Sequence, residues 1–377
     1  MSEFKASGFR DEFGSGGPDL VGITTMTSPY YFVPPSGSTA ERPQDPPPGM
    51  LRFNTDIGRL EVWRNDHWAT ILGESPNLGD TNNSNSTGGT GTRGLFGGAY
   101  SPSDVIDYIT IETLGNAQDF GNLQGSKFGT SSCASRTRGL WLGGHPGPLN
   151  EIDLVTIAST GNATDFGNLS QSRLYPSALS NQTRGICSGG GTPGGVVTMD
   201  YVTIAAEGNA VDFGDLTVAG YASASCESSV RGVVFAGRLN PSTYYNVIQY
   251  VTISTTGNAQ DFGDLSYVVG FAEAMGSSTR GLIGGGYSAP TYTNIIEFVT
   301  IASTGNSQDF GDLTLARGGL GGASSGIRAV WAGGVTGVNR NTMDFVTIAT
   351  TGNAIDFGDR TVEKESLSGC SNGHGGL

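Results

Sequence analysis

The chain has little positive charge. Against 34 Asp and Glu residues there are only 20 Lys and Arg residues, which gives a formal net charge of −14. Nucleic-acid binding needs clustered cations that neutralise phosphates, and binding to anionic membrane surfaces needs the same charges. We therefore expect neither nucleic acid nor a membrane among the partners. No apolar run reaches the roughly 18 residues of a spanning helix, so none is expected.

Histidine and cysteine are also scarce. The three histidines, His67, His145 and His374, stand far apart in unrelated contexts. No Ser-His-Asp or His-rich arrangement can be assembled from them, so we expect no catalytic residue, metal site or cofactor. The cysteines show no C-x-x-C spacing and are expected to be free, buried thiols. They are Cys133, Cys187, Cys226 and Cys370.

One stretch recurs six times. Its first copy, residues 107–123, reads D-Y-I-T-I-E-T-L-G-N-A-Q-D-F-G-N-L. The Gly-Asn pair within it returns at intervals of 46 to 49 residues, and its glycines are Gly115, Gly161, Gly208, Gly257, Gly305 and Gly352. A strand-rich repeat of about this length is typical of the blades of a β-propeller.

Each repeat contains four strand-like segments. In the first cycle they span residues 93–98, 108–113, 119–123 and 128–135. The apolar segment that ends in Gly-Gly resembles the second strand of a Kelch-type blade, so the small-residue segment should be innermost. No innermost segment precedes Arg93, and residues 366–371 match that pattern at the end of the chain. The predicted fold is therefore all-β: a six-bladed Kelch-like propeller over residues 93–377, closed by its C-terminal strand.

The residues before the repeats differ in composition. Residues 1–48 read as an extended arm, with a strand-like stretch from Leu20 to Val33 that can pair with a partner chain. Residues 49–72 alternate like a small three-stranded β-hairpin meander, which is too small to be stable alone. Residues 73–92 are a polar linker. The meander should therefore pack on copies of itself or on the rest of the chain.

The meander carries a recognisable pattern. Gly49 to Trp68 read G-x-L-R-F-N-T-D-x-x-x-x-E-V-W-x-x-x-x-W. This resembles a short β-hairpin segment common in virion proteins of tailed bacteriophages, especially fibres and their adaptors. The resemblance implies a trimeric or otherwise symmetric attachment segment that binds other virion proteins. Asn65-Asp66-His67 stands where that family often has Gly.

Two charged positions are the same in all six repeats. An Arg precedes each Gly-Gly strand, at Arg93, Arg138, Arg184, Arg231, Arg280 and Arg328. An Asp begins each D-F-G triplet, at Asp119, Asp165, Asp212, Asp261, Asp309 and Asp356. Blade topology puts both at the same end, so we hypothesise a repeated Arg–Asp latch. The alternative is an axial anion site of six arginines, as in sialidases, but the S-x-D-x-G-x-x-W boxes of sialidases are missing.

The loops between the second and third strands differ from repeat to repeat. They carry Tyr100, Tyr244, Tyr245, Tyr287 and Tyr292. Tyrosine offers a large rigid contact area together with a hydroxyl, which suits recognition. These five residues are the candidate binding face, and unconstrained drift of surface loops is the alternative explanation.

These observations favour a non-enzymatic virion structural protein, a tail or head fibre or other appendage. Its N-terminus would anchor it, and its propeller would bind a host-surface glycan or a protein. The first residues lack the apolar core of a signal peptide, so synthesis in the host cytoplasm is expected. A homotrimer is expected from the resemblance. The alternatives are an intracellular Kelch-type adaptor and, third, a sialidase-like propeller enzyme.

Overall fold

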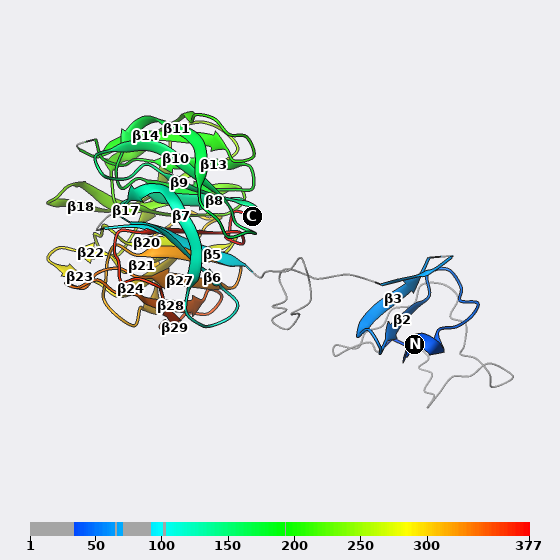
Figure 1. Cartoon of the computed structure of the whole chain (residues 1–377). Coiled ribbons are helices and arrows are strands. Elements are labelled where there is room, and N and C mark those ends of the chain that lie inside the picture. Colours follow the sequence, from blue (N-terminus) through cyan, green and yellow to red (C-terminus); the bar gives the residue numbers. More distant parts are fainter. Residues whose placement is uncertain (1–33, 65, 71–91, 101–102, 193) are drawn as a thin grey trace, which may run out of the picture. The chain divides into compact units, whose positions relative to one another are not determined.

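The computed structural model describes residues 34–64, 66–70, 92–100, 103–192 and 194–377 (Figure 1). The chain divides into two compact units, Met1–Glu74 and Ser75–Leu377. The strand-like stretch expected from Leu20 to Val33, and all but the last residue of the linker, lie outside the described residues.

The first unit contains a four-stranded sheet in the order β1-β2-β3-β4. The predicted meander forms β2 (Leu51–Asn54), β3 (Arg59–Trp63) and β4 (Trp68–Thr70). The fourth strand, β1 (Ser36–Gly37), comes from the arm and pairs parallel to β2. A single 3-10 turn, η1 (Thr39–Glu41), follows it. The described end of the arm is thus ordered because it lies on the hairpin.

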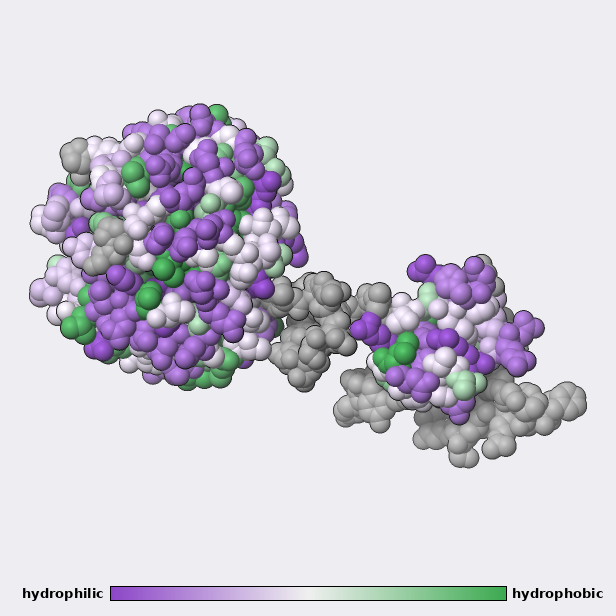
Figure 2. All heavy atoms as spheres, in the orientation of Figure 1, coloured by the Kyte–Doolittle hydropathy of each residue, from purple (hydrophilic) through white to green (hydrophobic). Residues whose placement is uncertain are grey.

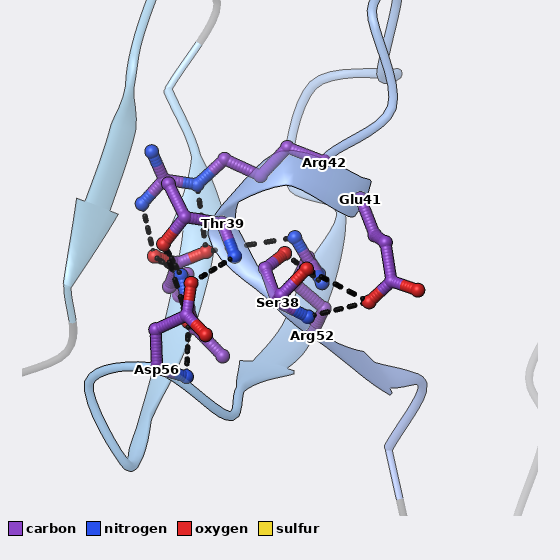
Figure 3. A network of polar contacts seen from close by, with 8 residues as sticks. Ser38, Thr39, Glu41, Arg42, Arg52 and Asp56 are labelled. Carbon is purple, nitrogen blue, oxygen red and sulfur yellow. Dashed lines mark hydrogen bonds and ion pairs between the residues drawn. The ribbon is translucent and has the colours of Figure 1, made fainter.

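A buried carboxylate, Glu61, joins the arm to the hairpin. It accepts hydrogen bonds from Asn54 Nδ2 at 2.8 Å and from Arg42 Nε at 3.1 Å. Asp56, in the turn after β2, accepts the Thr39 backbone N–H of the arm at 2.8 Å (Figure 3). Arg42 holds the pKa of Glu61 below its usual value against the effect of burial. The polar residues of the R-F-N-T-D…E pattern therefore hold the arm against the hairpin.

In this sheet the polar face is buried and the apolar face is partly exposed, the reverse of the usual arrangement. The polar residues Arg52, Asn54 and Glu61 are buried beneath the arm. The apolar cross-strand pairs lie on the other face, where Leu51 is 37 % exposed and its partner Val62 is half-buried. The described part of this unit therefore presents a partly exposed apolar face.

The second unit consists of small four-stranded antiparallel sheets, consistent with a β-propeller-like fold. Six such sheets follow the six repeats, in the orders β30-β5-β6-β7, β8-β9-β10-β11, β12-β13-β14-β15, β16-β17-β18-β19, β20-β21-β24-β25 and β26-β27-β28-β29. A two-residue hairpin, β22 with β23, lies in a loop of the fifth.

The strands of this unit are β5 (Arg93–Ala99), β6 (Ser103–Thr110), β7 (Gln118–Lys127), β8 (Ser131–Ala134), β9 (Arg138–Leu142), β10 (Leu149–Thr156), β11 (Thr164–Arg173), β12 (Ser177–Ser180), β13 (Arg184–Ser188), β14 (Val196–Thr203), β15 (Val211–Gly220), β16 (Ala224–Glu227), β17 (Arg231–Asn240), β18 (Thr243–Thr252), β19 (Gln260–Asp264), β20 (Glu273–Gly276), β21 (Arg280–Gly284), β22 (Tyr287–Ser288), β23 (Thr291–Tyr292), β24 (Ile295–Thr300), β25 (Gln308–Asp312), β26 (Gly321–Ser324), β27 (Arg328–Ala332), β28 (Thr342–Thr347), β29 (Ile355–Asp359) and β30 (Ser368–Ser371).

The C-terminal strand β30 pairs antiparallel with β5, with Ser368 opposite Gly97 and Ser371 opposite Gly94. This confirms the predicted pairing of the last strand with the first. The bounds of the second segment of the first repeat were wrong: 108–113 was expected, and β6 runs from Ser103 to Thr110. Ile111 is buried, but its backbone N–H already bonds to Thr92 beyond the ladder.

The apolar core is divided among neighbouring sheets. Six clusters of buried side chains each join two consecutive sheets, and one of them joins Phe96 and Ile109 of the first sheet to Val330 and Phe357 of the last. The D-F-G phenylalanines lie in these clusters as expected, each 2 % exposed. They are Phe120, Phe166, Phe213, Phe262, Phe310 and Phe357.

The short strands β8, β12, β16, β20, β26 and β30 contact one another in that order, and β30 contacts β8. Their small residues line a narrow central cavity, including Ser180, Ser225 and Ser324. The expected innermost position of these strands is thus confirmed. All four cysteines are free and buried, and burial raises the pKa of Cys187 and Cys370 to about 12.

Candidate binding face

A ring of backbone hydrogen bonds lies just before the innermost strands. Six equivalent residues have φ between 48° and 66°, and the N–H of each donates to the carbonyl of its counterpart in the preceding repeat at 2.8 to 3.0 Å. They are Gly129, Tyr175, Ala222, Phe271, Gly319 and Ser366. The first of them, Gly129, donates to the last, Ser366. We call this set the inner ring. Positive φ strains a non-glycine residue, and bulky residues rarely adopt it.

A second set of backbone bonds surrounds the first. The residue after each Gly-Gly position donates its N–H to the residue before an inner-ring position, at 2.7 to 2.9 Å. This outer ring consists of Tyr100, His145, Gly191, Arg238, Tyr287 and Val335. The backbone hydrogen bonds of the two rings are thus the same in every repeat, and the side chains at these positions differ. We call the surface formed by both rings and the adjoining loops the loop face.

Aromatic side chains form a connected group on the loop face. Tyr175 contacts Phe271 edge-on at 5.3 Å between ring centroids, and Phe128 contacts both Tyr175 and Tyr100, at 6.3 and 5.0 Å. His145 stacks on Phe128 at 4.7 Å. Such edge and offset contacts fix ring orientations and leave other ring faces open.

Four of the five predicted tyrosines belong to this group. Tyr287 contacts Tyr244 at 6.1 Å and Tyr292 at 5.2 Å, and Tyr100 is 49 % exposed. Tyr245 makes no ring contact among the described residues, because alternation along β18 turns it away from Tyr244. The sequence interpretation missed Tyr175 and Phe271 of the inner ring. A comparison of the residue two places before each innermost strand would have found them.

Arg238 joins the two parts of the aromatic group. Its guanidinium carbon lies 4.3 Å from the ring centroid of Phe271 and 4.7 Å from that of Tyr221. Its Nη1 donates to the Tyr244 hydroxyl at 3.3 Å, and its buried Nε has no partner. Among the ion pairs of the described residues, none involves Arg238.

The six repeated arginines lie at the opposite end, which we call the turn end. Each Nη1 donates to a backbone carbonyl of the next sheet, such as Arg231 to Ile301 at 2.9 Å. The last, Arg328, donates to Ile111 of the first sheet at 3.1 Å. Five of them also stack on an aromatic ring of their own sheet, as Arg231 does on Tyr250 at 4.3 Å. We call this contact the arginine clamp.

The structure does not bring these arginines to the D-F-G aspartates. Strand register explains this: Arg93, Tyr108 and Gln118 share one face of the first sheet, whereas Asp119 is on the other face. Asp119 and its five counterparts are exposed. The partner of each arginine is therefore a carbonyl and not Asp119, Asp165, Asp212, Asp261, Asp309 or Asp356. Counting residue parity along the strands could have revealed this.

The Gly-Asn pairs also connect consecutive repeats. The Gly161 N–H donates to the Phe120 carbonyl at 2.8 Å, and the Asn162 side-chain oxygen accepts the Asn122 N–H at 3.0 Å. A Cβ on Gly121 would lie 2.4 Å from the Gly161 oxygen, so only glycine fits there. The same contacts link Asn116 of the first repeat to Asp359 of the last.

Buried ion pairs link four of the six sheet interfaces. A base near the end of one repeat pairs with an acid in the third strand of the next: Lys127–Asp153 at 3.1 Å, Arg173–Asp200 at 2.6 Å, Arg317–Asp344 at 3.0 Å and Arg360–Asp107 at 2.8 Å. At the other two interfaces no base stands at this position: with Gly220 the acid position is Gln249, whereas with Val269 it stays an acid, Glu297, which accepts the Ser266 N–H. Burial raises the pKa of Asp153 and lowers the pKa of Arg317 and Arg360.

At the turn end the central cavity meets the last residues of the chain. His374 Nδ1 pairs with Glu227 at 2.5 Å, and its Nε2 lies 2.8 Å from the Ala134 carbonyl. Burial lowers the pKa of His374, but Glu227 and these hydrogen bonds outweigh it and raise the pKa overall. Glu273 also lines the cavity, and burial together with Glu227 raises its pKa.

In the described part of the chain, no group of three or more His, Cys, Asp or Glu side chains is arranged to hold a metal ion. Nor do these residues include a helix with the length and apolar character to cross a membrane. No protein-family model and no curated protein matches this chain.

Proposed function

We propose that the chain is a virion structural protein of a tailed bacteriophage, a tail or head fibre or another appendage. Its N-terminal unit attaches it to other virion proteins. Its repeat region is a closed six-bladed Kelch-like propeller whose loop face binds a host-surface glycan or protein. The protein acts by binding and not by catalysis.

Four sets of contacts that return from the sixth repeat to the first support the closed ring. They are the β30–β5 ladder, the inner ring, the arginine clamp from Arg328 and the Gly-Asn contact from Asn116. The Kelch-like reading rests on the Gly-Gly doublet after the second strand, where Gly143 and Gly144 have φ of 63° and 111°.

The exposed apolar face of the N-terminal sheet supports attachment and a trimer. An apolar face that includes Leu51 and Val62 is normally covered, and identical chains around an axis would cover it with one another. A few dozen residues rarely form a stable unit alone. The virion part of the proposal rests on the resemblance of Gly49 to Trp68.

The single observation that carries binding at the loop face is that its two constant rings of backbone hydrogen bonds bear unlike side chains. Architecture alone needs no aromatic residue at a strained position such as Tyr175 or Phe271. The described start of the repeat region and the C-terminus also lie away from the loop face. The hairpins β17–β18 and β22–β23 project on one side of the repeat region, and the start of β5 and the C-terminus lie on the other (Figure 1). Figure 2 shows pale residues of intermediate hydropathy along that projecting edge.

Mass spectrometry of purified phage particles tests the proposal. We expect peptides of this chain in the particles at constant stoichiometry, and its absence from them would remove the virion role and favour an intracellular adaptor. Light scattering of the full chain should give three copies. Val62→Arg should reduce that number, whereas Val338→Arg, an exposed change on a repeat-region loop, should leave it unchanged.

A further inference from the structure

Arg238 is an unusual cation in this chain. The buried bases Lys127, Arg173, Arg317 and Arg360 pair with carboxylates, and the six clamp arginines bond to carbonyls. Among the described residues, half-buried Arg238 and Arg340 have neither kind of partner, and of these two only Arg238 stacks on aromatic rings. Among the described residues its guanidinium donates one hydrogen bond, to the neutral Tyr244 hydroxyl at 3.3 Å, and its buried Nε has no acceptor. The remaining N–H donors of the Arg238 guanidinium are therefore available to an acceptor that a ligand brings.

The rings around Arg238 hold it in place. Phe271 and Tyr221 lie 4.3 and 4.7 Å from its guanidinium carbon, and Tyr244 lies 6.0 Å away. Stacking on several rings restricts the planar group to one orientation. Arg238 is only partly exposed, so an anion bound there would be partly shielded from water. The site therefore presents an oriented fork that suits a carboxylate or a phosphate.

The surroundings of Arg238 suit a ring-shaped ligand. Tyr175, Tyr244, Tyr287 and Tyr292 supply flat surfaces and hydroxyl groups within the same connected aromatic group. A sugar ring has apolar C–H faces and a rim of hydroxyls, so it can lie on an aromatic ring and hydrogen-bond at its edge. The other charged side chain near Tyr175 is Glu365. Its backbone carbonyl bonds to Tyr100 of the outer ring, three repeats away from Arg238. Glu365 can accept hydroxyl hydrogens at a distance from the anion.

From this geometry we propose that the loop face binds an acidic saccharide, whose carboxylate or phosphate group pairs with Arg238 while a sugar ring lies on the adjacent aromatics. This assignment rests on the proposed display of the loop face to a host surface. A protein epitope is the less favoured occupant, because the immediate neighbours of Arg238 are aromatic rings and not a broad aliphatic surface.

The test uses the full chain on an array of carboxylated, phosphorylated and sulfated saccharides, each beside its uncharged parent. Oligogalacturonate beside its methyl ester is one such pair, in which each carboxylate is replaced by a neutral ester. We expect binding to carboxylated or phosphorylated members, with at least about tenfold weaker binding to the uncharged parent. Binding should weaken as salt is raised.

Three variants locate the site. Arg238→Gln should lose at least about tenfold in affinity, and Arg238→Lys, which keeps the charge but not the planar fork, should fall between it and the parent. Arg340→Gln is the matched control: Arg340 lies on the same face, also has an unsatisfied Nε, and stacks on no ring within the described residues. It should bind within about twofold of the parent, since it offers no stacked fork. Circular dichroism checks that each variant is folded, and Tyr287→Ala provides a second disruption should Arg238→Gln unfold.

Equal binding to charged and uncharged members, silence across the whole array, or retained affinity in folded Arg238→Gln would each overturn the proposal. So would capture of a host-surface protein that is indifferent to Arg238. Presence of the chain in particles together with any of these results would refute the saccharide site alone. Binding to acidic saccharides by a chain that is absent from particles would refute the virion role alone.

Discussion

At the turn end of the repeat region, each repeat makes the same side-chain contact: an arginine donates to a carbonyl of the next sheet. At the loop face, the constant contacts are between backbone groups, and the side chains are Gly, Tyr, Ala, Phe and Ser on one framework. Identical side chains at one end hold the sheets together. Backbone bonds at the other end leave the side chains available for recognition.

The largest effect is expected from removing β30, the strand that closes the repeat region and reaches both ends. Deletion of residues 363–377 takes away β30 together with Ser366 of the inner ring. It exposes the edge of β5 and opens the cluster that contains Leu367. We expect cooperative thermal unfolding, followed by circular dichroism, to disappear. Deletion of 374–377 alone is the control and should keep a cooperative transition, and a 363–377 deletion that melts like the parent would contradict the closed ring.

The buried ion pairs separate contacts that carry stability from residues that are merely repeated. Asp200→Asn leaves Arg173 buried without its counter-charge and should lower the free energy of unfolding by about 3–5 kcal/mol. Asp212→Asn removes an exposed D-F-G aspartate and should change it by less than about 0.5 kcal/mol. Urea unfolding measures both. Equal losses in the two variants would contradict the difference assigned to these two aspartates.

The arginine clamp should have an intermediate effect. Arg231→Gln removes the bond to the Ile301 carbonyl and the stacking on Tyr250. Because the group is only partly buried, we expect a loss of about 1–2 kcal/mol in the free energy of unfolding. Arg136→Gln, an exposed arginine at the same end, should have no measurable effect. The clamp loses its assigned role should the two variants unfold at the same urea concentration.

The central cavity should give the smallest effect, and one that depends on pH. The pKa of Glu273 is raised by burial, so the folded state is penalised once pH exceeds the pKa of the unfolded chain, about 4.3. Glu273→Gln should therefore raise the melting temperature at pH 8 by roughly 1–3 °C and have little effect at pH 4. A gain that is the same at both pH values would show that the charge is not the cause.

His374, like Glu273, should make the protein less stable as pH rises, but here a favourable charge is lost, whereas at Glu273 an unfavourable charge is gained. Its pKa is raised in the folded state, so its contribution is complete below about pH 6.5 and is lost as pH rises through the folded value. His374→Gln should therefore lower the melting temperature at pH 5 more than at pH 9. Thermal melts of the parent and variant at the two pH values measure the difference.

Much of the repeat architecture follows from local pattern. The spacing of Gly115 and its counterparts gives the period, and alternation gives most strands. The match between residues 366–371 and the innermost segments predicted the β30–β5 pairing. These features are visible because each depends on a residue type that recurs at a fixed interval.

The site was harder to predict because it depends on tertiary geometry. The left-handed conformation of Tyr175 and Phe271 does not follow from residue type, since bulky side chains disfavour it. Arg173 and Asp200 lie in different repeats, and neither is unusual in its own strand. Alternation alone predicts that the apolar face of the hairpin is buried. The arm instead covers the polar face, with Arg52 and Glu61, and leaves Leu51 exposed.

The inner ring also affects how this surface can change. Its hydrogen bonds use only N–H and C=O groups, so one side chain can be exchanged for another without altering the contacts that close the ring. Glycine is the least strained residue there, and each aromatic residue costs about 1 kcal/mol or more of backbone strain. Substitutions at these positions can therefore accumulate one at a time. The proposed binding face can thereby acquire a new specificity while the fold stays the same.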